Sequence, residues 1–307
     1  MRARPFVSVA AALAVAFVIP SSARAGAWVP VPGEYYSQFT ASRFYADTYY
    51  LDDGTRATLS EIQEERRLTS YNELGWKKRA SLILAVPALS ITNRAGKDLG
   101  YASRTETGLG DLRIGVLYRL KGGPTALALQ ADWLTPLGYQ HDSIPSLGSG
   151  RQSLGAALHF GAGIPRINGF LELSGSGRGR IEKPPAQEIT PLGYWGAPTL
   201  YQPPTRFRRE YFGSATVAVW VRKSVLLSGS YLAQYASSGT TPEKNYVVVV
   251  SPQVLYRVDE RLDLLVGSHH TAAGKSVLHI DEFYIGMAFK QTRLNRLQGF
   301  LGGTKSP

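Results

Sequence analysis

The sequence predicts an all-β protein, a transmembrane antiparallel up-and-down β-barrel of about twelve strands behind an N-terminal signal peptide. Three observations lead to this prediction: a secretory leader, long segments of alternating apolar and polar residues, and an alternation of short and long connections between these segments. Of the 307 residues, 44% are hydrophobic and 11% aromatic, which excludes a disordered chain. The mean hydropathy of −0.13 excludes a bundle of transmembrane helices. It does not exclude a barrel, because half of each barrel strand faces a polar lumen.

The leader is predicted from the first 25 residues. Arginines precede an apolar run at 6–19, Pro20 ends that run, and Ala23–Ala25 forms an A-x-A cleavage site. The run is shorter than the about 20 apolar residues of a membrane-spanning helix. We therefore expect cleavage after Ala25. The predicted organisation is a signal peptide at 1–25, an outer-membrane barrel at 26–290 and a C-terminal tail at 291–307.

Twelve segments have the two-residue period of a β-strand. Segment 109–121 places apolar residues at every even position from Leu112 to Leu120, and the same alternation recurs further along the chain. Pro252 predicts a bulge or a local break in segment 244–258, because proline cannot donate to the ladder. Most segments exceed the about 9–11 residues of a tilted membrane strand. The segments are 34–46, 61–76, 79–92, 109–121, 124–135, 151–164, 166–180, 207–222, 224–236, 244–258, 260–273 and 279–290.

The connections between these segments are of two kinds. Short turns are expected at 77–78, 121–123, 165, 223 and 259. Long loops are expected at 47–60, 93–108, 136–150 and 181–206, with shorter loops at 237–243 and 274–278. Outer-membrane barrels have short periplasmic turns and longer extracellular loops, and an even strand count places both termini in the periplasm.

Aromatic residues provide a second indication. Tyr118, Tyr256 and Phe289 would face outward at the periplasmic end of the strands. Trp133, Tyr211, Tyr235, Tyr246 and Phe283 would face outward at the other end. Two such girdles match the two headgroup levels of a bilayer. The alternative is a soluble β-sandwich or lipocalin-like barrel, but it would bury the charged face of these strands, which is prohibitively costly.

The inner face suggests a solute path. The candidate path residues are Arg113, Arg119, Arg178, Arg208 and Arg257, with Asp132 and Glu172 as partners. Such charges line polar paths and attract anions, but they also pair across a narrow lumen and brace its wall. The sequence leaves these two roles open.

The predicted loop 181–206 is rich in proline and carries Tyr194, Trp195 and Tyr201. Stiff proline segments with exposed rings suit a lid or a constriction over the mouth of the barrel. The alternative is a surface loop whose rings pack on neighbouring loops. The tail after Phe289 has a short amphipathic pattern that suits either the periplasm or a plug of the lumen.

Nothing in the sequence indicates an enzyme, a cofactor or a metal site. The chain has no cysteine, and it lacks the G-x-S-x-G and H-E-x-x-H motifs. The only candidate for a nucleophile and base, and a loose one, is His159 with Ser153 or Ser174. His269 and His270 are adjacent on one strand and so point to opposite faces. The formal charge of +11 does not indicate nucleic acid, because a secreted protein occupies the wrong compartment.

Four segments together resemble one known family. They are 71–75, 82–87, 107–120 and 147–150, of which 107–120 contains the most specific motif, G-L-G-D-L-x-x-G-x-x-Y-R-L. These segments resemble the outer-membrane transporters of the "MetA-pathway of phenol degradation" type and the related XagA-like proteins. The resemblance implies a Gram-negative outer-membrane barrel with a channel or transport role. It supplies no ligand-binding residues for this chain.

The leading hypothesis is thus a porin-like channel for small polar, anionic or aromatic solutes. The alternative is a closed barrel that acts in surface interaction or as an accessory to exopolysaccharide export. The expected partners are outer-membrane lipids and a small-molecule solute, with no nucleic acid. The oligomeric state stays open.

Overall fold

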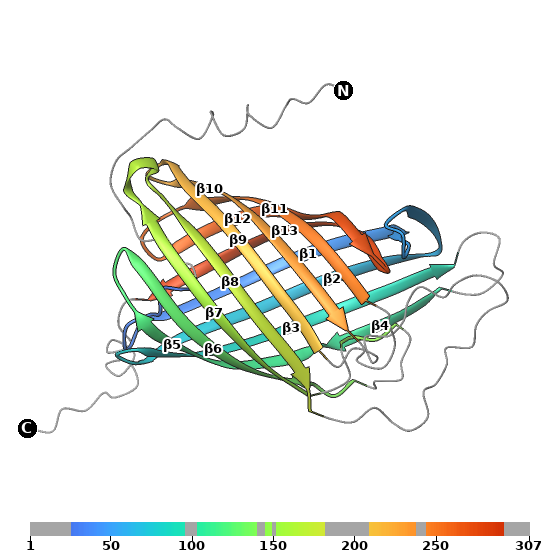
Figure 1. Ribbon diagram of the computed structural model, residues 1–307, viewed down its shortest axis with the longest axis horizontal. Coiled ribbons are helices and arrows are strands. Elements are labelled where there is room, and N and C mark those ends of the chain that lie inside the picture. The colour runs from blue at the N-terminus through green and yellow to red at the C-terminus, as the bar shows by residue number, and fades with distance from the viewer. Residues whose placement is uncertain are drawn as a thin grey trace, which may run out of the picture.

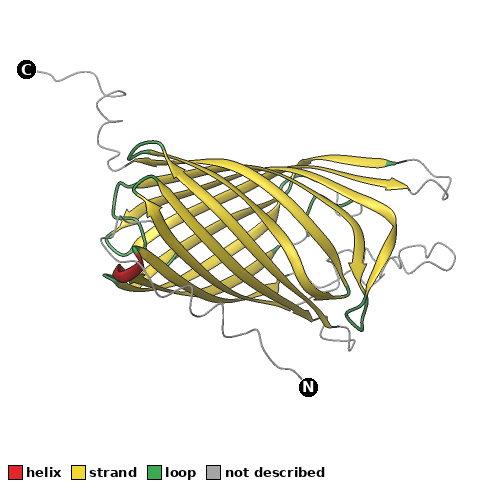
Figure 2. Ribbon diagram, turned by 90° about the horizontal axis from the view of Figure 1, so that it is seen from above, coloured by secondary structure: helices red, strands yellow, loops and turns green. Residues whose placement is uncertain are grey.

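The protein is a closed antiparallel β-barrel (Figures 1 and 2). The computed structural model describes residues 26–95, 103–139, 145–148, 152–181, 209–237 and 244–291. The strands are β1 (Tyr35–Tyr50), β2 (Arg56–Lys77), β3 (Ala80–Ala95), β4 (Arg104–Leu109), β5 (Asp111–Lys121), β6 (Thr125–Pro136), β7 (Ser153–Ile164), β8 (Gly169–Arg180), β9 (Arg209–Arg222), β10 (Val225–Ser237), β11 (Lys244–Arg257), β12 (Leu262–Lys275) and β13 (Val277–Gln291).

The thirteen strands make a wall of twelve. Apart from β4 and β5, sequence neighbours pair with each other, β1 also pairs with β13, and the β2–β3 pairing closes the sheet. The strands β4 and β5 both pair with β3, one beyond the other, so they form a single wall strand interrupted at Gly110. The predicted architecture and strand number are therefore confirmed.

The helical content is slight. A 3-10 turn, η1 (Pro165–Ile167), joins β7 to β8. No helix within the described ranges is long and apolar enough to cross a membrane.

Three predicted loops were placed wrongly. The loop expected at 274–278 is a tight turn at Ser276, between the end of β12 at Lys275 and the start of β13 at Val277. The expected loop 47–60 is a turn at Leu51–Thr55, closed by a backbone hydrogen bond of 2.8 Å from Leu51 N to Thr55 O. The expected loop 93–108 begins later and ends earlier, because β3 continues to Ala95 and β4 starts at Arg104. The errors at 47–60 and 93–108 arise because β1, β2 and β3 continue past the apolar band, where polar outward residues hide the strand period. Together with β4, these strands extend furthest at the long-loop end of the barrel (Figure 1).

The disturbance expected at Pro252 is one-sided. The β10–β11 register runs past the Gly229↔Pro252 pair without a shift. On the other side, the β11–β12 register passes from Val250↔His270 to Gln253↔Gly267. Pro252 thus has no register partner on β12, the strand to which a backbone N–H at this position would have donated.

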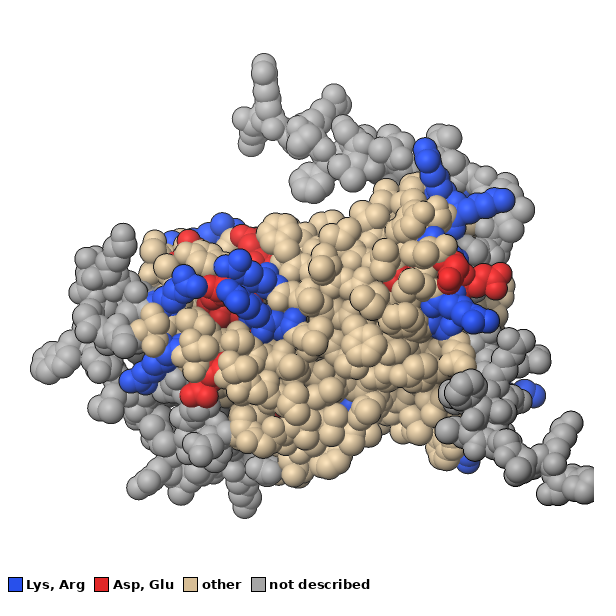
Figure 3. Space-filling view, turned by 180° about the vertical axis from the view of Figure 1, so that it is seen from behind, with Lys and Arg blue, Asp and Glu red and all other residues tan. Residues whose placement is uncertain are grey.

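The outer surface carries the predicted apolar band. All eight aromatic residues assigned to the two girdles are exposed. In the upper girdle, Tyr211, Tyr235 and Tyr246 are register partners on β9, β10 and β11. Figure 3 shows one face on which uncharged residues cross the middle and charged residues gather at the two ends. This distribution is that of a membrane-spanning wall.

Candidate functional site

Charged side chains on the inner face are joined in pairs across neighbouring strands. The pairs are Arg113–Asp132 between β5 and β6, Arg178–Glu210 between β8 and β9, and Arg257–Asp263 between β11 and β12. In the first, the Nε and Nη2 of Arg113 donate to the two oxygens of Asp132 at 3.0 and 2.8 Å. Each pair joins two strands, so these guanidinium groups brace the wall while part of their charge is neutralised.

The pair nearest the periplasmic end is the most buried. The side chain of Asp263 is 1% exposed and also accepts a hydrogen bond from Lys290 on β13. The Arg257 guanidinium lies 4.3 Å above the centre of the Trp220 ring, a cation–π distance. This group joins β9, β11, β12 and β13 at one level of the lumen.

A polar chain continues from Arg113 around the wall. Gln130 donates to Asp132 at 2.9 Å, and His159 lies 3.0 Å from the Oε1 of Gln130. The Nδ1 of His159 is 3.6 Å from a carboxylate oxygen of Glu172 on β8. The charged partner of Glu172 is therefore His159, whereas the charged partner of Asp132 is Arg113.

The other predicted site residues have different positions. Arg119 lies at the periplasmic rim, where its guanidinium donates to the backbone carbonyl of Lys78. The described residues do not include Arg208, Tyr194, Trp195, Tyr201, the signal peptide predicted at 1–25 or the tail after Gln291.

Hydroxyl groups line the wall from β8 to β12. Ser174 and Ser214 are 2.7 Å apart, Thr216 and Ser230 are 2.8 Å apart, and Ser251 lies 2.6 Å from His269 Nδ1. In the loose pair considered for catalysis, Ser174 is thus bonded to Ser214 and His159 to Gln130.

Residues 26–33, here called the N-terminal segment, lie inside the periplasmic end of the barrel. Val29 is 5% exposed and packs on Ile83, Leu117 and Ala128, which face inward from β3, β5 and β6. The Trp28 ring meets Phe170 of β8 edge-on at 6.0 Å between centroids. The segment thus contacts the inner wall across five neighbouring wall strands, β3 and β5 to β8.

Backbone hydrogen bonds hold the far end of this segment. Gly33 N donates to Gly75 O at 2.9 Å, and Gly75 N donates to Glu34 O at 2.8 Å. The Trp28 indole N–H donates to the Gly123 carbonyl at 3.2 Å. Sequence reasoning missed this segment. The available signal was an apolar, proline-containing stretch, too short for a strand, directly after the predicted cleavage site.

A second insert occupies the lumen nearer the long-loop end. Residues 145–148 of the β6–β7 connection place Leu147 against Leu89 and Ile91 of β3. Beside it, the Tyr139 hydroxyl donates to Asp111. Asp111 thus holds the base of an inward loop.

The chain was compared with known proteins. Residues 25–283 match the family described as "Putative MetA-pathway of phenol degradation". No curated protein matches the chain significantly.

Solved structures share the fold. The crystal structure of the COG4313 outer membrane channel from Pseudomonas putida F1 has a TM-score of 0.69 and 12% identity over 86% of this chain and 97% of that one. The NanC porin has a TM-score of 0.48 and 9% identity, covering 83% of this chain and all of that one. The CymD monoaromatic hydrocarbon channel has a TM-score of 0.39 and 8% identity, covering 85% and 88%. Identities this low establish the fold alone, and only the first of these scores exceeds 0.5.

Proposed function

Because this chain belongs to the family of the putative MetA-pathway of phenol degradation, we propose that it is an outer-membrane channel for small solutes. The observation that carries the proposal is what fills the periplasmic end of the lumen. Inward positions there hold small residues such as Ala128 and Gly161, and the space beside them is occupied by Trp28 and Val29. A permanently closed barrel would fill this space with side chains of its own wall. A separate segment instead suits a plug that can be displaced.

The N-terminal segment is the proposed plug. If cleavage occurs after Ala25, Gly26 carries a free ammonium group. A methyl group added to Gly26 would lie 2.9 Å from Oε1 of Glu172 and 3.2 Å from Nδ1 of His159. The new ammonium group is then within reach of a carboxylate, and this charge pair would hold the plug in place.

The proposed solutes are small polar, anionic or aromatic molecules passing an arginine-lined wall. The aromatic rings of Trp28, Phe170 and Trp220 gather at the periplasmic end and offer stacking surface. Since the neighbouring carboxylates neutralise much of the charge of Arg113, Arg178 and Arg257, we expect only a weak preference for anions.

The test compares two refolded chains, residues 26–307 and residues 34–307, in planar lipid bilayers. We expect the shorter chain, which lacks the N-terminal segment, to conduct several-fold more current. Heat-dependent gel mobility and circular dichroism establish that both chains have folded. A folded 34–307 barrel that carries no current would overturn the channel proposal.

A further inference from the structure

Three arginines and one glutamate form a charged cluster on the outer surface of the wall. The cluster consists of Arg43 on β1, Glu64 and Arg66 on β2, and Arg94 on β3, and is called the outer arginine cluster below. Its members share the strand face of Phe39, Leu68 and Leu84, which are exposed on the outside of the barrel. Charged residues on such a face need a reason, because most of it contacts lipid.

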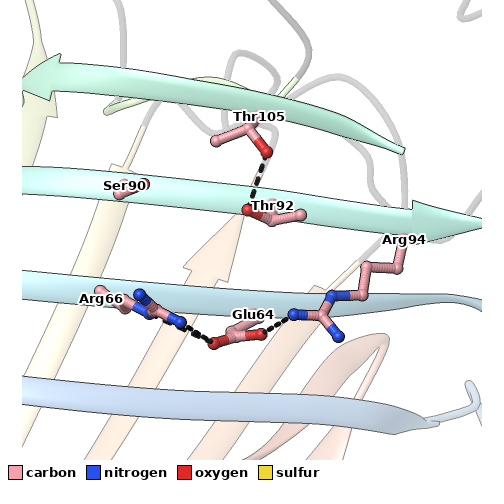
Figure 4. Close-up of a pocket in the computed structure, with 6 residues that line it drawn as sticks. All are labelled: Glu64, Arg66, Ser90, Thr92, Arg94 and Thr105. Atoms are coloured by element: carbon pink, nitrogen blue, oxygen red, sulfur yellow. Dashed lines mark hydrogen bonds and ion pairs between the residues drawn. The ribbon is translucent and has the colours of Figure 1, made fainter. Parts of the chain in front are cut away.

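The cluster carries an excess of positive charge around one buried carboxylate. Glu64, 6% exposed, accepts Arg43 at 2.9 Å, Arg66 at 3.3 Å and Arg94 at 2.7 Å (Figure 4 shows the last two). Three guanidinium groups against one carboxylate leave a net charge of +2. The arginine side chains remain 63%, 68% and 55% exposed, so each has donors turned to the surroundings.

The register places the cluster at the upper aromatic girdle and beyond it, toward the long-loop end. Arg43 is the cross-strand partner of Phe283, a member of that girdle, and the same row reaches β3 at Ser90. The row from Trp133, the girdle residue of β6, reaches β3 at Leu84. Because such rows run oblique to the axis of a barrel of tilted strands, the girdle crosses β3 between Leu84 and Ser90, and Arg94 lies beyond it.

Hydroxyl groups complete a shallow site beside the arginines. A cavity of about 220 Å³ is lined by Glu64, Arg66, Ser90, Thr92, Arg94 and Thr105. The hydroxyls of Thr92 and Thr105 are 2.9 Å apart at its edge (Figure 4). Toward the periplasm, the same wall exposes Leu68, Leu84 and Leu109. The surface therefore combines a cationic, hydroxyl-lined patch at and beyond the upper girdle with an apolar patch on its periplasmic side.

We propose that the outer arginine cluster binds a phosphate group of an acylated glycolipid in the outer leaflet, a lipid of the lipopolysaccharide class. Guanidinium groups bind phosphate oxygens through paired, charge-assisted hydrogen bonds, and the leucines below match the acyl chains. A second copy of this chain is a poorer occupant, because a twofold contact here would bring two +2 clusters together. The proposal requires the barrel in its membrane and is independent of solute passage.

The test measures binding of purified bisphosphorylated lipid A to the detergent-solubilised protein by native mass spectrometry. The variant Arg43→Gln/Arg66→Gln/Arg94→Gln should bind about tenfold or more weakly, since it loses several charge-assisted hydrogen bonds. The control Lys77→Gln/Lys78→Gln/Arg79→Gln removes three exposed cations at the periplasmic end and should bind as the parent does. Lipid A without phosphates should bind the parent protein weakly.

A third variant keeps the test independent of folding defects in the triple arginine variant. Glu64→Gln removes the carboxylate that competes with phosphate, so lipid A binding should become tighter. Equal binding of phosphorylated and dephosphorylated lipid A, or unchanged binding in both the triple variant and Glu64→Gln, would overturn the proposal.

Discussion

Individual charged side chains in the lumen are held by cross-strand ion pairs, which the sequence pattern could not predict. Alternation along β5 places Arg113 inside, and alternation along β6 places Asp132 inside. That they bond to each other depends on the register between the strands, which a turn and its neighbours fix. Alternation therefore predicted the lumen-facing positions of Arg113 and Asp132, but not that the two side chains bond to each other.

The Arg113–Asp132 pair gives the first residue-scale prediction. Arg113→Gln leaves a largely buried carboxylate without its charged partner and should lower the free energy of unfolding by about 1.5–3 kcal/mol. Urea unfolding of the refolded protein measures this change. In Arg113→Gln/Asp132→Asn most of the loss should be restored. If the double variant is as unstable as the sum of both single variants, the two side chains are not coupled.

At the scale of single elements, the wall strands were more predictable than the segments that lie inside the barrel. The two-residue period located twelve strands because it is a local property of each segment. It missed the ends of β1 and β2, where polar residues continue outward. It also missed residues 145–148, because their contact with β3 joins segments more than fifty positions apart, Leu147 and Leu89 among them.

The interruption between β4 and β5 gives a prediction for this loop. A methyl group on Gly110 would lie 2.8 Å from Cδ1 of Leu89 and 2.9 Å from the Leu147 carbonyl oxygen. Gly110→Ala should therefore displace residues 145–148 and increase proteolysis of the β6–β7 connection. The matched control is Gly213→Ala on β9, where no atom lies within 4 Å of the added methyl group. Equal proteolysis of the two variants would contradict the packing described here.

On the scale of the whole molecule, a membrane barrel encloses a segment from its own N-terminus. Composition and periodicity indicated the barrel because they sample every strand. They could not indicate the plug, since Val29 meets Ile83, Leu117 and Ala128 only once the barrel has closed. The sequence did not predict the outer arginine cluster for the same reason, because its four members come from three strands.

The central claim is that solutes cross the lumen past a displaceable N-terminal segment, and a reversible tether tests it most directly. Val29 of the N-terminal segment packs on Ala128 of β6, so two thiols at these positions lie within reach of each other. The chain has no cysteine of its own. Val29→Cys/Ala128→Cys therefore allows one disulfide between plug and wall, with each single variant as control.

Single-channel conductance of this double variant should be low under oxidising conditions and rise several-fold when the disulfide is reduced. The single variants should not respond to the reductant. If the oxidised and reduced double variant conduct equally well, then solutes do not pass the N-terminal segment, and the account of this lumen as the gated path is wrong.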